Sequence, residues 1–157
     1  MKILILAIGI TDDNWVKEGM HKYSKRIPHY LPFEFEPIND LKNTKNLSEA
    51  QQKEKEGLLI LNKIKPTDKV VLLDEKGKEY PSKKFAYYIQ KQMNSGVKRL
   101  VFVIGGPYGF SDELYAKVNE KIALSKMTFS HQMVRPFLLE QIYRAMTILK
   151  NEPYHHE

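Results

Sequence analysis

The stretch RLVFVIGGPYGFSDEL, residues 99–114, decides the fold that we expect for this chain. Its first six residues are almost wholly apolar and run directly into two glycines, a pattern typical of a buried strand that ends in a turn. Ser111 follows, with Asp112 and Glu113 behind it, and this order is typical of a helix N-terminus. The stretch therefore predicts a strand, a glycine-rich loop and a helix in succession.

Apolar runs and amphipathic segments alternate along the rest of the chain. Strands are expected at residues 2–8, 33–38, 69–74, 99–104 and, as a short strand or an extended loop, 123–129. Helices are expected to begin at Asn14, Ser48, Ser82, Ser111 and Pro136. The alternation favours an α/β fold in which one parallel sheet is sandwiched by helices. The 157 residues show no linker or repeat and are expected to form a single domain, residues 1–157.

Two of these helices carry further expectations. The first is expected to include Ile27 and to end at Pro28, because proline disfavours the helical region for the residue before it. The second opens with a Ser-Glu-Ala-Gln capping box at residues 48–51. The dense charge of residues 51–56 predicts that the first half of this helix faces solvent.

The composition excludes several classes of site. The chain has no cysteine, which excludes disulfides and a cysteine nucleophile and fits a reducing compartment. No apolar run suits a secretory signal or a membrane span, so we expect a cytoplasmic protein without a membrane partner. The net charge of +6 fits either a lysine-rich surface or a polyanionic partner, and charge alone does not separate the two.

Ligands of parallel α/β sheets bind beyond the carboxyl ends of the strands, which directs attention to the loops after Asp74 and Ile104 and to residues 125–131. The glycines at 105, 106 and 109 match neither the dinucleotide-binding pattern nor a P-loop. They serve either a turn with positive φ or the close approach of a ligand. Because Asp112 and Glu113 follow, a neutral or cationic ligand fits better than an anion.

Polar side chains also crowd the stretch ALSKMTFSHQMVRPFLLEQIYRA, residues 123–145, which suits a pocket. Arg144 lies four residues after Glu140, a spacing that equally predicts an ordinary ion pair on a helix. The terminal NEPYHHE, residues 151–157, is either a frayed end or a docked tail in which Tyr154 and His155 meet a base. Adjacent histidines without a third ligand do not favour a metal site.

Three motifs carry a resemblance that runs essentially end to end: VFVIGGPYG, LSKMTFSHQMVRPFLLEQIYRA and EPYHHE. They resemble the ribosomal RNA large-subunit methyltransferase H family of the SPOUT superfamily. The resemblance implies a homodimeric enzyme that transfers a methyl group from S-adenosylmethionine to N3 of a pseudouridine in the 23S rRNA of the assembled ribosome. It also implies a trefoil knot in the C-terminal half, which the strand and helix pattern alone does not suggest.

Site residues are carried over from the family by position. The resemblance implies cofactor contacts at Leu73, Gly105, Leu124, Ser125, Lys126, Met127, Thr128 and Phe129. It implies catalytic roles for Arg144, Tyr154 and His155, and no metal. His156 stands where members often carry Arg or Lys, which is expected to weaken one phosphate contact at neutral pH without removing the chemistry. Two alternatives stay open: a related SPOUT enzyme with another RNA target, and a non-catalytic ribosome-binding module.

Overall fold

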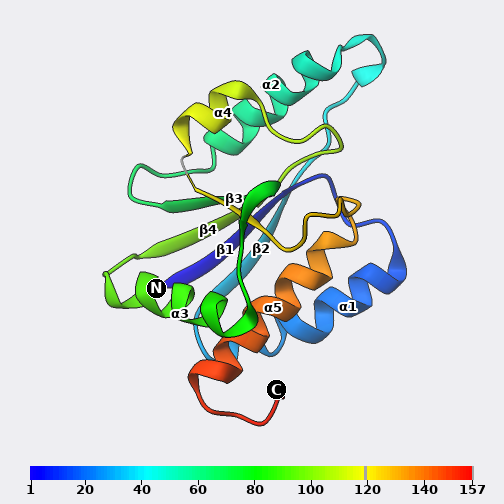
Figure 1. Ribbon diagram of the computed structural model, residues 1–157. Coiled ribbons are helices and arrows are strands. Elements are labelled where there is room, and N and C mark those ends of the chain that lie inside the picture. The colour runs from blue at the N-terminus through cyan, green and yellow to red at the C-terminus, as the bar shows by residue number, and fades with distance from the viewer. Residues whose placement is uncertain (119, 157) are drawn as a thin grey trace.

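Five strands form one sheet at the centre of the computed structural model, which describes residues 1–118 and 120–156 (Figure 1). The strand order is β2-β1-β4-β3-β5, and the strands pair in parallel. The strands are β1 Lys2–Ile8, β2 Phe33–Ile38, β3 Lys69–Glu79, β4 Arg99–Ile104 and β5 Lys121–Ala123. This arrangement confirms the expected α/β fold with a parallel sheet.

Helices cover both faces of the sheet (Figure 1). They are α1 Asn14–Ser24, α2 Glu49–Leu61, α3 Ser82–Asn94, α4 Asp112–Lys117 and α5 Val134–Leu149, with short 3₁₀ helices η1 Ile27–His29 and η2 Thr44–Asn46. Helices α1, α3 and α5 contribute to one apolar cluster and α2 and α4 to the other. The helices therefore form two layers with the sheet between them.

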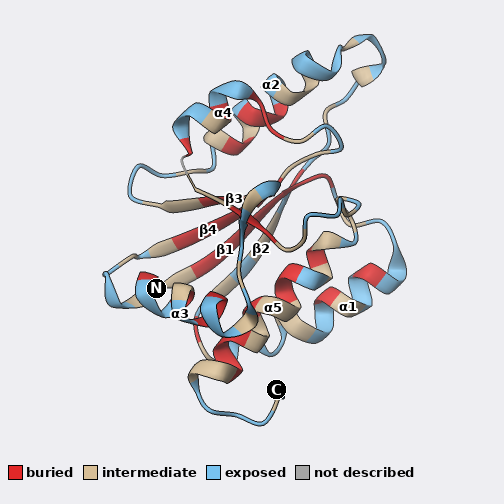
Figure 2. Cartoon of the chain, in the orientation of Figure 1, coloured by how far each residue is buried: buried red, intermediate tan, exposed pale blue. Residues whose placement is uncertain are grey.

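The core follows from the continuous apolar runs of the central strands. Ile3 and Ile5 of β1 pack toward α1, α3 and α5, whereas Leu4 and Leu6 pack toward α2 and α4. All four side chains are buried, as expected for a parallel strand that is covered on both faces. Figure 2 shows the buried residues concentrated on β1, β4 and the inner sides of the helices.

The two best-defined helix starts are confirmed, and the others differ from expectation. Ser48 Oγ accepts a hydrogen bond from Gln51 N, and the Gln51 side chain accepts one from Ser48 N, which completes the capping box. Ser111 Oγ accepts from Leu114 N. Asn14 and Ser82 are wrong as caps, because they are the first helical residues and follow Asp13 and Pro81. Their predecessors have the extended backbone that a cap position needs.

Two other helix boundaries differ from expectation. The first helix ends at Ser24, before the expected end at Pro28. Ile27 and Pro28 belong instead to the separate 3₁₀ helix η1, whose turn is tighter than that of an α-helix. The last helix begins at Val134, so Pro136 lies within its first turn, where a missing backbone N–H has no cost.

The edge of the sheet at β3 and β5 is built differently from the expectation. β3 continues to Glu79, and its register against β5 shifts between Leu73 and Lys78. Gly77 permits this shift, because a Cβ there would lie 2.6 Å from backbone atoms of Ile122. Of the two alternatives expected for residues 123–129, the loop is confirmed, since β5 ends at Ala123 and a loop follows.

The path of the chain around α5 is where the implied knot would lie. In Figure 1 the connection from β3 to α3 crosses in front of the loop between β5 and α5. The knot itself stays a prediction from the resemblance.

Candidate functional site

A cavity of about 790 Å³ opens at the carboxyl ends of β3 and β4. Its walls come from residues 73–76, from the glycine loop at 104–110, from most of residues 124–134, and from Lys53, Asp112 and Tyr115. The first three segments are the loops that we expected to bind a ligand from the order of strands and helices. Their convergence supports placing the binding site at the carboxyl ends of the strands.

The glycine loop is a tight turn with two separate reasons for its glycines. Gly109 has φ +80°, which favours glycine, and its N–H donates to Gly106 O at 3.1 Å. A Cβ on Gly106 would lie 2.9 Å from the Glu56 carboxyl carbon, and one on Gly105 would lie 3.1 Å from the Phe110 ring. The close approach at Gly106 is therefore to the chain itself.

Glu56 corrects the expectation that residues 51–56 face solvent. It is 4% exposed and packs behind the glycine loop from α2. Its Oε1 accepts a hydrogen bond from Gln52 at 2.9 Å, and its buried Oε2 has no partner among the described residues. Burial raises the pKa of this carboxyl, and the nearby Asp40 adds to the rise. Because Glu56 belongs to a run of charged residues, nothing in the sequence indicated that its side chain is buried.

The loop after β5 brings most of the expected cofactor residues together. Leu73, Gly105, Leu124, Ser125, Met127, Thr128 and Phe129 all line the cavity. Thr128 donates a hydrogen bond to Glu75, and Met127 N donates to Ser125 Oγ at 3.0 Å. Lys126 is not among the lining residues, because its exposed ammonium points toward Glu79, 3.9 Å away.

Carboxylates and aromatic rings set the character of the cavity. Asp74, Glu75 and Asp112 line it together with the rings of Tyr108, Phe110, Tyr115 and Phe129. The Tyr115 hydroxyl donates to Asp74, and burial and this bond raise the pKa of Tyr115. Lys53 and Lys76 are the basic side chains of the lining. The cavity thus offers bare backbone, flat apolar surface and negative charge.

A second group of expected site residues gathers at the far end of α5. This C-terminal cluster consists of Glu140, Arg144, Tyr154 and His155. Arg144 donates to Glu140 Oε1 at 2.6 and 3.0 Å and lies 3.2 Å from His155 Nδ1. The Tyr154 hydroxyl lies 3.1 Å from Glu140 Oε1. These contacts confirm that the tail docks through Tyr154 and His155, while Glu157 lies outside the described residues.

Electrostatics fix the protonation states of Arg144 and Tyr154 in this cluster at neutral pH. The hydrogen bond to Glu140 raises the pKa of Arg144, so the guanidinium stays charged. Burial raises the pKa of Tyr154, and its contacts with Tyr23 and Glu140 raise it further, so the phenol stays neutral. A fixed cation beside a neutral aromatic ring suits recognition of a base that acquires negative charge.

The cavity and the C-terminal cluster are separate within one chain. Val134, at the start of α5, lines the cavity, whereas Arg144 lies ten residues farther along the same helix. At the α-helical rise this corresponds to about 15 Å. None of Arg144, Tyr154 and His155 lines the cavity, and Figure 1 shows the C-terminal tail at the end of α5 away from the cavity loops.

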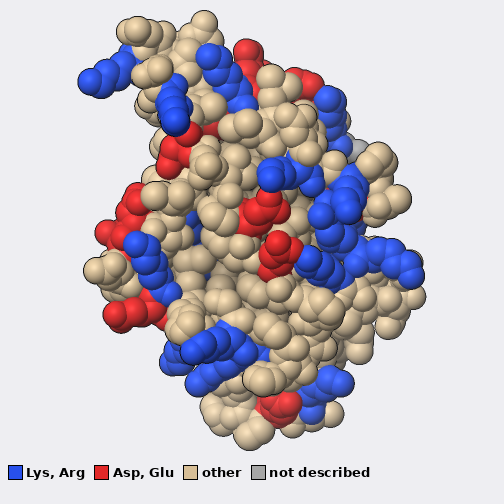
Figure 3. All heavy atoms as spheres, turned by 180° about the vertical axis from the view of Figure 1, so that it is seen from behind, with Lys and Arg blue, Asp and Glu red and all other residues tan. Residues whose placement is uncertain are grey.

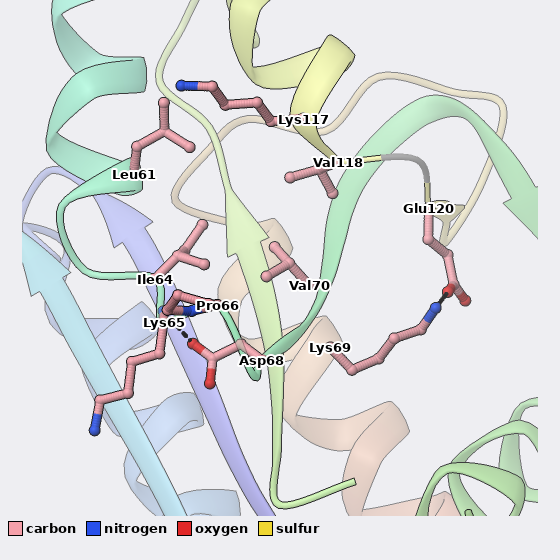
Figure 4. Close-up of a pocket in the computed structure, with 10 residues that line it drawn as sticks. All are labelled: Leu61, Ile64, Lys65, Pro66, Asp68, Lys69, Val70, Lys117, Val118 and Glu120. Atoms are coloured by element: carbon pink, nitrogen blue, oxygen red, sulfur yellow. Dashed lines mark hydrogen bonds and ion pairs between the residues drawn. The ribbon is translucent and has the colours of Figure 1, made fainter.

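A smaller cavity, of about 500 Å³, lies at the opposite end of the strands, near the start of β3 (Figure 4). Most of its charged side chains are engaged with one another or with neighbours: Asp68 binds Arg99, Lys69 pairs with Glu120, and Lys117 pairs with Glu113. Such satisfied pairs serve the structure, so the larger cavity is the better candidate site. Within residues 1–118 and 120–156, no cluster of His, Asp or Glu could hold a metal ion, and no helix could cross a membrane.

Comparison with known proteins assigns the fold and the family. Residues 1–155 match the family described as "Predicted SPOUT methyltransferase". The chain belongs to the SPOUT methyltransferase family. Curated relatives named "Ribosomal RNA large subunit methyltransferase H" match it over the full length of both chains: 62% identity in Parabacteroides distasonis, 60% in Flavobacterium psychrophilum and 52% in Porphyromonas gingivalis.

A solved structure shares the SPOUT chain's fold at low sequence identity. It is described as a probable methylase family protein from Haemophilus influenzae, with a TM-score of 0.53 and 10% identity. The match covers 99% of this chain and 70% of that one. The likeness supports the parallel α/β architecture and nothing more specific.

Proposed function

We propose that this protein is an S-adenosylmethionine-dependent methyltransferase that acts as a cytoplasmic homodimer on N3 of a pseudouridine in 23S rRNA of the assembled ribosome. The observation that carries the proposal is the convergence of three loops on one cavity, in a chain 62% identical to a named large-subunit rRNA methyltransferase. The rear face also carries several groups of Lys and Arg side chains, which suit a polyanionic partner (Figure 3).

The lining of the cavity fits this methyl donor. Around Gly109 a Cβ would meet nothing within 4 Å, so backbone there is open to a ligand. The rings of Tyr108, Phe110 and Phe129 offer flat surface for an adenine, and Asp74, Glu75 and Asp112 offer negative charge for a sulfonium. When bound, S-adenosylmethionine supplies the methyl group as an electrophile.

The C-terminal cluster supplies what the base requires. The imide N3–H of a uracil-type base is weakly acidic, so its reaction needs a proton acceptor and stabilisation of negative charge. His155 is our candidate acceptor: its Nδ1 accepts from Arg144, 3.2 Å away, and would take the proton of the base once that contact opens. Arg144 is the candidate stabiliser of the negative charge. Tyr154 offers a ring for stacking, which is worth about 1–3 kcal/mol per base.

A dimer resolves the separation of about 15 Å between the cavity and the C-terminal cluster, a figure that follows from the helical rise. We infer that the cluster of one subunit serves the cavity of its partner. Exposed apolar side chains near the cavity suit such an interface: Ile10, Trp15, Met133 and Phe137. Leu138, Ile142 and Met146 of α5, by contrast, are core residues, so this apolar face of the helix packs within its own chain.

The decisive experiment is methylation of ribosomes from a strain that lacks the modification. The purified protein and labelled methyl donor are added, and the modified nucleotide is mapped. Transfer to a pseudouridine N3 in 23S rRNA is expected. Transfer to another nucleotide would indicate a different RNA target, and tight ribosome binding without measurable donor affinity would indicate a non-catalytic module.

A further inference from the structure

The segment after β1, residues 9–13, lies against the end of the cavity loop at residues 130–134. In Figure 1 these connections lie side by side, one leading into α1 and the other into α5. His131 and Val134 line the cavity. Contacts that fix residues 130–134 therefore also fix the position of this part of the cavity wall.

Arg135 is a fully buried cation that joins three parts of the chain. Its Nη2 donates to Ile8 O at 2.8 Å, its Nη1 to Thr11 Oγ1 at 2.8 Å, and its Nε to His131 O at 2.9 Å. Burial lowers the pKa of the guanidinium. Burying a charge is costly, and one use of such groups is to specify a single conformation.

Gln132 makes a second, independent connection between the same segments. Its Nε2 donates to Ile10 O at 2.9 Å, and its Oε1 accepts from Asp12 N at 3.2 Å. The side-chain amide of Gln132 therefore satisfies a backbone N–H and a backbone C=O of residues 9–13, which lie outside any helix or strand. Gln132 and Arg135 are here called the loop anchor.

The middle of the cavity loop needs such an anchor. Met127 is 77% exposed, and residues 124–129 are attached mainly through Thr128 to Glu75 and through the local bond between Ser125 and Met127. A loop with few long-range contacts samples more conformations, and a ligand that selects one of them binds more weakly.

We propose that Gln132 and Arg135 are positioning residues that hold the α5 end of the cavity loop in its binding-competent shape before the ligand arrives. They act through His131 and Val134, not through direct contact with the reacting atoms. The identity of the ligand rests on the proposed function, whereas the effect of the loop anchor on the free protein does not.

The test uses Gln132→Ala, with Gln90→Ala on the exposed side of α3 as the matched control. Hydrogen exchange of residues 124–134 is measured in the free protein, and S-adenosylmethionine binding is measured by titration calorimetry. Loss of two hydrogen bonds predicts faster exchange in this loop and an affinity lower by about tenfold, with kcat retained at saturating donor. Gln90→Ala is expected to change neither quantity.

Arg135→Lys provides the second variant. It keeps the charge but cannot make all three hydrogen bonds, so a larger loss of affinity is expected if the variant folds. Unchanged exchange and unchanged affinity in Gln132→Ala would overturn the proposal. If the wild-type protein binds no S-adenosylmethionine, the proposed function fails, and the exchange data alone still decide whether the anchor orders the loop.

Discussion

The guanidinium carbon of Arg144 lies 4.8 Å from the centroid of the Tyr154 ring. This cation–π contact joins the last turns of α5 to the C-terminal tail, and Glu140 accepts hydrogen bonds from both side chains. The ring of Tyr154 also packs edge-on against Tyr143 at 4.7 Å. The tail is thereby presented as a preformed surface that needs little ordering when a base arrives.

Replacement of Arg144 should separate chemistry from donor binding. Arg144→Ala removes the charge that stabilises the base, so single-turnover methylation of ribosomes is expected to fall about 10²–10³-fold, as for other electrostatic stabilisers. Calorimetric affinity for S-adenosylmethionine should change little, because Arg144 does not line the cavity. Arg26→Ala, which removes an exposed cation from the neighbouring Tyr143 ring, is the control. Equal losses in turnover and affinity would make Arg144 a structural residue.

Tyr154 should contribute through its ring more than through its hydroxyl. Tyr154→Phe keeps the stacking surface and loses the bonds to Glu140 and Tyr23, so methylation should fall only slightly. Tyr154→Ala should lower the ribosome methylation rate at limiting substrate by the equivalent of about 1–3 kcal/mol. Thermal melting of both variants checks that the fold is retained. Similar activity in all three proteins would remove the ring from the site.

A side chain at Gly106 should reveal the contact with Glu56. Gly106→Ala forces the buried carboxyl to move and to lose its bond with Gln52, at an expected cost of about 1 kcal/mol in unfolding free energy. In a Glu56→Ala background the same substitution should cost measurably less, and a double-mutant cycle in denaturant measures the coupling. Gly19→Ala in α1, where a Cβ makes only ordinary contact, should not destabilise the protein. Additive effects of the two substitutions would show that the residues do not interact.

The buried carboxyl of Glu56 should also make stability depend on pH. Its pKa is raised above the ordinary value of 4.5, so the folded state holds the proton more tightly than the unfolded state. The contribution of Glu56 to stability is therefore fully present below pH 4.5 and is lost as the pH rises through the folded pKa. Glu56→Gln cannot ionise, so its unfolding free energy relative to wild type should increase over this range. A pH-independent difference between the two proteins would contradict a raised pKa.

The sequence predicts the sheet well because its central strands carry their own signal. Leu100 and Phe102 of β4 lie on one face of the sheet and pack toward α3 and α5, whereas Val101 and Val103 lie on the other face and pack toward α2. A strand covered on both sides reads as a continuous apolar run. Ser48 and Ser111 were equally readable, since a cap needs only local residues.

The features that sequence reasoning missed depend on contacts between distant segments. Glu56 and Arg135 are charged residues of types that normally face solvent, and only the fold shows that each is buried. The extension of β3 depends on the close approach of the Gly77 backbone to that of Ile122, and no local sequence pattern predicts such a contact. The distance between the cavity and Arg144 likewise follows from the straight course of α5, so residues that the resemblance grouped into one site fall into two groups.

Mixed dimers test whether the two groups form one site across subunits. Met127→Arg places a cation in the cavity at an exposed position, so it should block a sulfonium ligand without disturbing the fold. Arg144→Ala disables the C-terminal cluster and leaves the cavity intact. Each variant alone should be inactive as a homodimer. A site that combines one subunit's cavity with its partner's cluster is intact once in every mixed dimer.

Random exchange of equal amounts makes half of the dimers mixed, so the mixture should recover up to about a quarter of the wild-type methylation rate. The rate is measured on unmodified ribosomes after co-refolding or co-expression with two different affinity tags, which also isolates the mixed dimer. A site formed within one chain predicts no recovery, because each chain of the mixed dimer then carries one defective half. Recovery in the doubly tagged fraction alone would place Arg144 opposite the cavity of the partner subunit. Inactivity there, with both variants folded and dimeric, would place the whole reaction within one chain and would require the tail to leave its position on α5.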